Sequence, residues 1–447
     1  MTVPSEYNAD LIARLAPGVE LIGEYQGSGF RDPRYIVCRS DGQVIQLPRL
    51  LYLLTASVDG RRDLEELAHV LSTACGKVVQ AQHVAYWIDN RLLPAGIVTT
   101  GPDAGYSETR QTGGTPKNPV RSDPLLAMKF RVRVVPENAV WRIAGIFRPL
   151  FWPPMLLAAL AGFVTLDVVL IARGGLSQIV PSALALVYQP TLSLLVLAAI
   201  FASAAFHECG HVAACRYGGA RPGKMGIGLY LVWPALYSTV TDSYRLSRAG
   251  RLRTDLGGVY FNAIFIAGLA LAYLGTGSSW VLVAIVALHG ETAMQFLPMI
   301  RLDGYYILSD LIGVPDLFSR MGPVLKSMIP GQPLHPRVCE LKPWVRRTIT
   351  LWVAVVVPAL LYWVIGFLIV VPQVVPVLWH RLVWLTGAVG TAAAAGRTAE
   401  ATLDVVDLIL SLLPWAGSLL VLGLIVRGPV GWALARWSPA QVRARRC

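Results

Sequence analysis

Six long apolar segments constrain this chain more than any other feature. Most approach the ~20 residues that a helix needs to cross ~30 Å of hydrocarbon. They lie near residues 151–172, 188–206, 256–275, 279–298, 348–371 and 404–426. Charged residues make up 15% of the chain, whereas soluble domains carry roughly 25%. The sequence therefore predicts a mainly α-helical, polytopic membrane protein with about six transmembrane helices.

The basic residues orient these segments. Arginine and lysine are concentrated in the loops after the second, fourth and sixth segments, and the intervening loops carry far fewer. Because cytoplasmic loops of membrane proteins are enriched in basic residues, we expect both termini on the cytosolic side. The net charge of +12 then fits contact with membrane lipid and requires no nucleic-acid partner.

The first hundred residues have the character of a small soluble domain. Two β-rich runs flank Asp41-Gly42, which predicts a hairpin over 35–47. Three helices, the second with Asp63 as its N-cap, and a closing strand are expected near 50–54, 64–71, 80–92 and 97–98. This order describes a small α+β winged-helix domain.

The same segment resembles the PqqD-like fold, a leader-peptide recognition element of pathways that make ribosomal peptide natural products (RiPPs). The resemblance lies in the order of elements and in residues 41–71, DGQVIQLPRLLYLLTASVDGRRDLEELAHVL. It implies that a strand edge and an adjacent helix capture an extended leader peptide. A plain winged helix that packs on the membrane domain or binds DNA is the alternative. The charges are mixed in sign rather than gathered in a basic stripe, which argues against nucleic acid.

The chain is thus expected to have four parts. These are a recognition domain, a linker with an interfacial segment, a membrane domain and a basic cytosolic tail, over 1–100, 101–148, 149–430 and 431–447. Within the second part, residues 129–135 alternate cationic and apolar side chains, which suits a strand or a segment lying on anionic lipid. Residues 224–237 are apolar but interrupted by glycine and proline, which favours a re-entrant hairpin or a surface loop.

The second apolar segment ends in His207-Glu208-Cys209-Gly210-His211. On a helix, histidines at i and i+4 project from one face and can bind one metal ion, and Glu208 is placed to take a proton from metal-bound water. A satisfied histidine pair is the alternative reading. Such groups at the end of a membrane helix are costly unless they are paired or metal-bound, so we expect one catalytic Zn²⁺.

A catalytic tetrahedral zinc needs a third protein ligand. Leu302-Asp303-Gly304 follows the fourth apolar segment, on the same predicted side of the membrane as His211. Asp303 can present a carboxylate oxygen to the metal, and it can also cap the helix expected over 305–311. The two roles are compatible.

Three motifs together, His207 to His211, Gly258 to Asn262 and Leu302-Asp303-Gly304, resemble the site-2 protease family of intramembrane zinc metalloproteases. The resemblance covers residues 188–312. It implies zinc ligation by His207, His211 and Asp303, general acid–base catalysis by Glu208 and donation to the substrate carbonyl or oxyanion by Asn262. Val259 stands where the family usually has proline. Residues 298–306 are similar to a bacterial branch that carries a PqqD-like domain, which implies the bacterial cell membrane.

These features predict a zinc-dependent intramembrane endopeptidase that cleaves a peptide bond with zinc-activated water. The preferred substrate is a ribosomal precursor peptide whose leader is removed. One alternative is a regulatory site-2 protease that cleaves a membrane-anchored anti-sigma factor. Another is a non-catalytic peptide-binding or immunity protein with a structural zinc, although such a site has no need of the base that Glu208 supplies.

Overall fold

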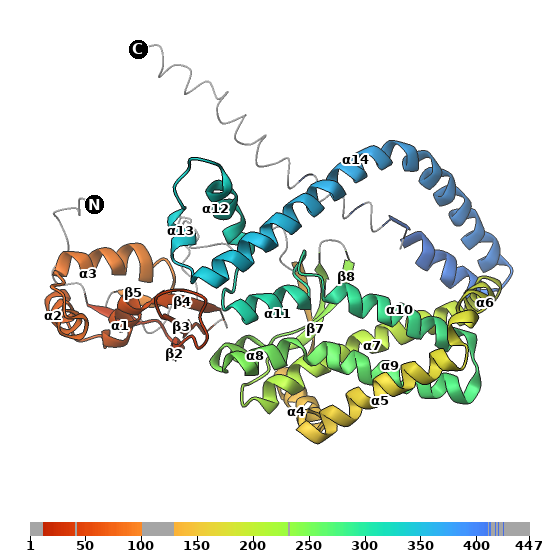
Figure 1. Ribbon diagram of the computed structural model, residues 1–447, viewed down its shortest axis with the longest axis horizontal. Coiled ribbons are helices and arrows are strands. Elements are labelled where there is room, and N and C mark those ends of the chain that lie inside the picture. Colours follow the sequence, from red (N-terminus) through yellow and green to blue (C-terminus); the bar gives the residue numbers. More distant parts are fainter. Residues whose placement is uncertain are drawn as a thin grey trace, which may run out of the picture. The chain divides into compact units, whose positions relative to one another are not determined.

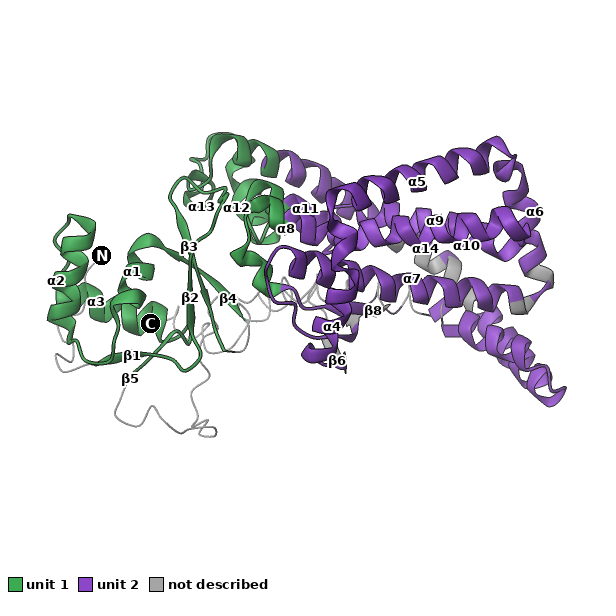
Figure 2. Cartoon of the chain, turned by 90° about the horizontal axis from the view of Figure 1, so that it is seen from below, with its two compact units in different colours: residues 1–122, 241–251, 309–349 green, residues 123–240, 252–308, 350–447 purple. Residues whose placement is uncertain are grey.

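In this computed structural model, residues 12–40, 43–100, 129–230 and 233–409 are described, with a few positions between 411 and 423. The chain forms two compact units, each assembled from segments distant in sequence (Figure 2). Unit 1 comprises residues 1–122, 241–251 and 309–349. Unit 2 comprises residues 123–240, 252–308 and 350–447.

The N-terminal part of unit 1 contains small sheets and three helices (Figure 1). An antiparallel sheet has the order β2-β3-β4, and a second pairs β1 with β5. These strands are β1 (Ala13–Leu15), β2 (Glu20–Glu24), β3 (Arg34–Cys38), β4 (Val44–Pro48) and β5 (Val98–Thr100). The helices are α1 (Arg49–Ser57), α2 (Leu64–Cys75) and α3 (Ala81–Trp87), and a π-helical turn over Ile88–Leu92 extends α3.

The predicted hairpin, three helices and closing strand are confirmed, whereas β1 and β2 were not predicted. The Asp41-Gly42 turn lies outside the described residues. Asp63 caps α2 as expected, because its carboxylate accepts a 2.8 Å hydrogen bond from the Glu66 amide. The α2 residues Leu64, Leu67 and Leu71 are buried in one apolar core with residues of α1, α3 and β5. Assignment of these elements to the winged-helix class stays a prediction.

Later segments complete unit 1. They are the 3₁₀ helix η3 (Thr241–Arg245), the start of α8 (Arg248–Asp255), the end of α11 (Asp303–Ile312), α12 (Phe318–Met328), α13 (Pro336–Cys339) and the start of α14 (Pro343–Ala394). The loop after β2 is bonded to them through main-chain groups. The Gly29 amide donates to the Gly313 carbonyl, and the Gly29 carbonyl accepts from the Lys342 amide, both at 2.9 Å.

Unit 2 is mainly helical. Its helices include α4 (Glu137–Phe147), α5 (Pro153–Ala172), α6 (Gly175–Tyr188), α7 (Pro190–Tyr217), α9 (Gly257–Thr276), α10 (Ser279–Gln295) and most of α14. Among the residues that the structure describes, four stretches are long and apolar enough to cross a membrane: Pro153–Ala172, Leu192–Tyr217, Gly257–Thr276 and Pro343–Val370. They correspond to the first, second, third and fifth predicted segments, so this chain is a helical membrane protein.

The fourth and sixth predicted segments are not among these four candidate spans. The fourth predicted segment forms α10, a helix of 17 residues. The sixth, 404–426, falls largely outside the described residues. Helix α6 was not expected, because Pro181 interrupts its sequence. The count of six spans and the side on which the termini lie remain predictions.

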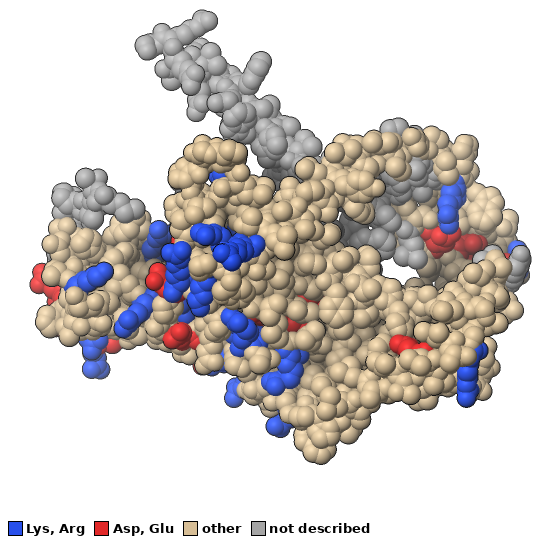
Figure 3. Space-filling view, viewed as in Figure 1, with Lys and Arg blue, Asp and Glu red and all other residues tan. Residues whose placement is uncertain are grey.

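The surface of unit 2 fits a lipid environment. On α5, Leu157, Val164, Val168 and Ile171 are all more than half exposed. Figure 3 shows long stretches of the unit 2 helices without charged side chains, and many lysines and arginines over the elements of unit 1. Apolar side chains that are exposed over a whole helix require a solvent less polar than water.

A three-stranded antiparallel sheet of unit 2 has the order β6-β7-β8. Its strands are β6 (Lys129–Val135), β7 (Met225–Tyr230) and β8 (Trp233–Ser238). The strand reading of 129–135 is therefore confirmed. Strands β7 and β8, which cover the described part of 224–237, pair antiparallel, and re-entry of this segment into the membrane stays a prediction. Gly226 lets β6 approach, because a β-carbon there would lie 2.1 Å from the Val132 carbonyl oxygen. Since β8 pairs only with β7 in the described sheet, it is an edge strand.

Candidate metal centre

His207 and His211 lie on one face of α7. Their Nε2 atoms are 3.1 Å apart, and both residues are buried, with 6% and 8% of their surface exposed. The predicted spacing on a helix is thus confirmed. The same face of α7 packs against α9, which carries the second predicted motif.

Glycines allow α7 and α9 to approach each other closely. A β-carbon on Gly210 would lie 2.2 Å from the Gly257 carbonyl oxygen, and one on Gly257 would lie 2.6 Å from the Gly210 carbonyl oxygen. Gly258 lies beside the histidines themselves, since its β-carbon would be 2.4 Å from Nε2 of His207. These three positions have no room for a side chain unless the helices or the imidazoles move.

Asp303 comes to the same place from the first turn of α11. Its Oδ2 lies 3.1 Å from His207 Nε2, and its Oδ1 lies 3.6 Å from His211 Nε2. Gly304 makes this possible, because a β-carbon there would lie 2.2 Å from the Phe296 carbonyl oxygen just after α10. Trp352 of α14 also anchors the loop between α10 and α11, because its Nε1 donates a hydrogen bond to the Pro298 carbonyl.

The three side chains fit a zinc ion. Their ligand atoms all lie within 4.8 Å of one another. Two ligands at ~2.1 Å from a tetrahedral zinc are ~3.4 Å apart. The two imidazole nitrogens are 3.1 Å apart, and each lies 3.1–3.6 Å from one carboxylate oxygen, Oδ2 for His207 and Oδ1 for His211. Asp303 Oδ2 and His207 Nδ1 are buried without a well-aligned hydrogen bond within the described part of the chain. A buried carboxylate oxygen facing two imidazole nitrogens is a donor set suited to a cation.

The protonation states also suit a metal. His211 Nδ1 lies 2.8 Å from the Thr254 carbonyl oxygen of α8. Because a carbonyl only accepts, Nδ1 carries the proton and Nε2 presents its lone pair to the centre. Burial alone would raise the pKa of the Asp303 carboxyl, but without a metal the positive charge of protonated His211 and a hydrogen bond from His207 outweigh it and hold that pKa below its usual range. A bound cation would replace that charge once His211 Nε2 gives up its proton. The Asp303 carboxylate is therefore ionised and can serve as a metal ligand.

The two predicted catalytic residues lie on the helices that form the centre. Glu208 follows His207 on α7 and is half-buried. Asn262 is buried on α9, one turn after Gly258 and so on the same side of the helix. Asn262 Nδ2 donates to Thr292 Oγ1 at 3.1 Å and Gln295 Oε1 at 2.9 Å on α10. To donate to a substrate carbonyl, Asn262 would have to exchange one of these bonds.

Sequence reasoning missed several residues that shape the centre. Thr254 acts through its carbonyl, which no side-chain pattern reveals. Thr292 and Gln295 resemble ordinary polar residues of an apolar helix. The Gly257-Gly258 pair was a usable signal, since two adjacent glycines at the start of a membrane-length helix indicate close backbone packing.

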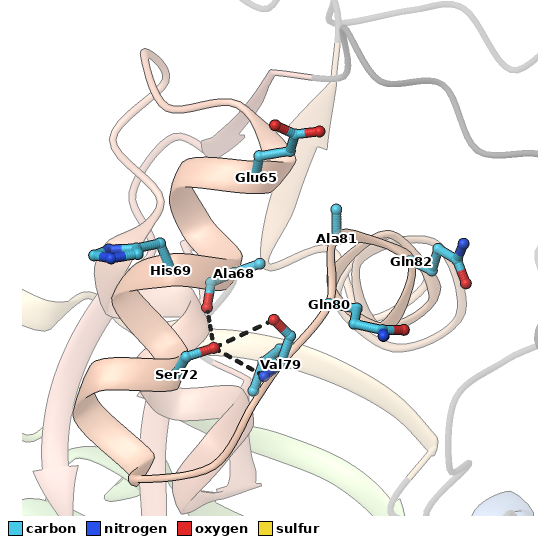
Figure 4. Close-up of a pocket in the computed structure, with 8 residues that line it drawn as sticks. All are labelled: Glu65, Ala68, His69, Ser72, Val79, Gln80, Ala81 and Gln82. Atoms are coloured by element: carbon cyan, nitrogen blue, oxygen red, sulfur yellow. Dashed lines mark hydrogen bonds between the residues drawn. The ribbon is translucent and has the colours of Figure 1, made fainter.

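A separate hollow of about 470 Å³ lies in unit 1 between α2 and α3 (Figure 4). Glu65 and His69 of α2 line one side, and Gln80 and Gln82 line the other. Ser72 holds the connection between the helices, accepting from the Val79 amide at 2.8 Å. The ligand cluster of the metal centre is not part of this hollow.

Comparisons with known proteins point to the same chemistry. No protein-family model matches the chain, and no solved structure matches it significantly. Over 116 residues the chain is 32% identical to a protein of Bacillus subtilis (strain 168) named "Putative peptide zinc metalloprotease protein YydH". The match covers 26% of this chain and 46% of that relative, less than half of its length. The similarity supports a zinc protease family for a chain whose His207, His211 and Asp303 form a site suited to zinc.

Proposed function

We propose that this protein is a zinc-dependent endopeptidase of the site-2 type that cleaves a peptide bond at the membrane. The observation that carries the proposal is the convergence of His207, His211 and Asp303 on one point, with Glu208 beside the first ligand. The ligands come from a membrane-length helix and from the start of α11. A protein with a purely structural zinc would have no need of a carboxylate next to the ligands.

Each residue has a distinct task in this reaction. A bound zinc supplies Lewis acidity, which polarises the scissile carbonyl and lowers the pKa of water to roughly 7. Glu208 accepts the proton of the attacking water and passes it to the leaving amine, so that water is added across the C–N bond. Thr254 keeps the His211 lone pair directed at the centre. Asn262 would stabilise the developing charge, an effect of about 3 kcal/mol for one good donor.

We further propose that the substrate is the precursor of a ribosomal peptide natural product and that its leader is removed. The relative's printed name, a peptide metalloprotease, favours a peptide substrate. In the described sheet of the N-terminal part of unit 1, β2 and β4 are edge strands. An extended leader peptide could pair with either of them as an additional strand. Strand β8 offers a similar edge in unit 2. The PqqD-like assignment and a cytosolic location of both termini belong to this proposal.

The decisive experiment uses Glu208→Gln in the full-length protein in lipid nanodiscs. The probe is a short precursor peptide identified by a search of the neighbouring genes, and its products are identified by mass spectrometry. We expect the variant to keep stoichiometric zinc and to lose cleavage by at least ~10²-fold. The matched control is Glu137→Gln, an exposed glutamate of unit 2, which should cleave like the wild type.

Other outcomes separate the rival functions. Undiminished cleavage by zinc-loaded Glu208→Gln would refute the catalytic assignment. Zinc binding without any cleavage by the wild type would favour the non-catalytic peptide-binding or immunity protein. Cleavage of a membrane-anchored anti-sigma factor, with the precursor peptide left intact, would retain the protease and replace its substrate.

A further inference from the structure

Helix α4 of unit 2 buries one face and exposes the other. Val140 and Ala144 have no exposed surface. They pack in one apolar cluster with Val212 of α7 and Met225 of β7. The buried face therefore fixes the orientation of α4, and the opposite face points away from α7 and β7.

Large apolar side chains are exposed on and just after this helix. Ile146 of α4 is 72% exposed, Trp141 is 42% exposed, and Trp152, the residue before α5, is 59% exposed. The Arg216 guanidinium lies over the Trp141 ring, 3.9 Å from its centroid, so the indole is held in place although it is exposed. Clustered apolar side chains of this size are unfavourable in water and indicate contact with a partner or with lipid.

The charged residues of the same stretch are mostly basic. Residues 129–152 contain one lysine, four arginines and one acidic residue, Glu137, which pairs with Lys224 at 3.3 Å. Arg142 and Arg148 are exposed and have no acidic partner among the described residues, so this region attracts anions. Together with the exposed apolar residues, these arginines form what is called the α4 surface below: Trp141, Arg142, Ile146, Arg148 and Trp152.

The chain keeps the α4 surface close to the end of a candidate membrane span. The span Pro153–Ala172 begins directly after Trp152. Between α4 and that point lies the 3₁₀ helix η2 (Arg148–Phe151), whose four residues cover ~8 Å at ~2 Å per residue. The headgroup layer of one leaflet is about 5–7 Å thick. The end of α4 is therefore expected in or next to that layer, where tryptophan is enriched in membrane proteins.

We propose that the α4 surface lies at the membrane interface and binds the headgroups of anionic phospholipid. Ile146 and the two tryptophans enter the boundary between headgroups and acyl chains, and Arg142 and Arg148 pair with lipid phosphates. Basic residues beside exposed tryptophan and aliphatic side chains on an amphipathic helix are typical of such a contact. The contact lies within unit 2 and is independent of the zinc chemistry proposed above.

The test titrates the full-length protein in neutral detergent with phosphatidylglycerol or phosphatidylcholine, and native mass spectrometry counts the bound lipids. We expect the wild type to bind phosphatidylglycerol more tightly. Arg142→Ala combined with Arg148→Ala should lower that affinity roughly 10-fold and leave the affinity for phosphatidylcholine unchanged. The matched control is Arg381→Ala combined with Arg397→Ala, which removes two exposed arginines of unit 2 that already have acidic partners.

An equal loss of phosphatidylglycerol affinity in the control would show that net charge alone decides, which overturns the proposal. Equal affinities of the wild type for the two lipids would overturn it as well, and so would displacement of phosphatidylglycerol by millimolar inorganic phosphate. Should the double variant fail to fold, Ile146→Glu decides, because a side chain that is 72% exposed can be changed without disturbing the packing of α4. Weaker binding of phosphatidylglycerol by Ile146→Glu supports the lipid contact, and unchanged binding overturns it.

Discussion

The backbone of Gly258 lies directly against the imidazole of His207. A β-carbon on this glycine would be 2.4 Å from both Cε1 and Nε2 of the histidine, far inside van der Waals contact. Helix α9 therefore forms one wall of the candidate zinc site through its main chain. Even a methyl group at this position must displace a ligand or separate α9 from α7.

Gly258→Ala is accordingly expected to weaken zinc binding by roughly 10–100-fold, the range seen when the surroundings of metal ligands are disturbed. Competition with a chromogenic chelator measures this affinity. Gly268→Ala is the matched control, because Gly268 lies on the same helix and a β-carbon there would have nothing within 4 Å. Equal zinc affinities for the two variants would contradict the packing described for α9.

Zinc should stabilise the protein in proportion to its occupancy. At free zinc 100 times the dissociation constant, the expected gain in unfolding free energy is about 2.7 kcal/mol. Thermal unfolding in detergent, followed with added zinc and with a chelator, measures the effect. The gain should disappear in His211→Ala and in Asp303→Ala, and a shift of the same size in either variant would place the bound zinc elsewhere.

Two glycines of unit 1 allow the cost of a left-handed backbone to be measured apart from the cost of a steric clash. Gly313 and Gly331 have φ of +70° and +80°, but only Gly313 has a neighbouring backbone where a β-carbon would stand. Gly331→Ala should cost ~1–2 kcal/mol through its left-handed conformation, and Gly313→Ala a further ~1–3 kcal/mol through overpacking. Thermal unfolding of the two variants should show the difference, and equal losses would argue against tight docking of the Gly27–Gly29 loop.

Unit 1 should lose stability in alkaline solution through Tyr25. Burial, followed by the charge of Asp310, raises the pKa of the Tyr25 hydroxyl. A raised pKa favours folding below the unfolded value of about 10, and this contribution is lost progressively as pH rises above it. Unfolding midpoints measured between pH 8 and 11.5 should fall at the alkaline end, and Tyr25→Phe should flatten that fall. An identical pH profile for Tyr25→Phe would show that other groups cause it.

Much of the fold could be predicted where a local pattern decides the structure. Asp63 with Glu66 set the start of α2, and apolar runs of membrane length became α5, α7 and α9. Helix α6 was missed because Pro181 lies within it and the preceding loop contains Arg173. Strand β2 was missed because Gly23 and two glutamates weaken its pattern, while pairing with β3 stabilises it.

The residues of the candidate site likewise include some that a local sequence pattern predicts and some that it does not. His207 and His211 share a helix face, so their spacing alone predicts a metal pair. Asp303 needed the topological argument that places it on the same side of the membrane. Thr254 could not be found from sequence, since any residue has a carbonyl. In unit 1, the ion pair of Arg251 with Asp310 joins residues 59 positions apart, and nothing in the many charges of the chain singles out this pair.

The division of the ligands between α7 and α11 has a consequence for biosynthesis. The ribosome completes the histidine pair long before it reaches Asp303, so a nascent chain that already carries Glu208 still lacks its third ligand. The N-terminal segment that contains Tyr25 is finished earlier still, yet its docking partners on α11 and just before α14 are translated only after Asp303. A nascent chain that ends before residue 303 thus contains the histidine pair without the carboxylate, and the three candidate ligands cannot come together while the first apolar helices are being made.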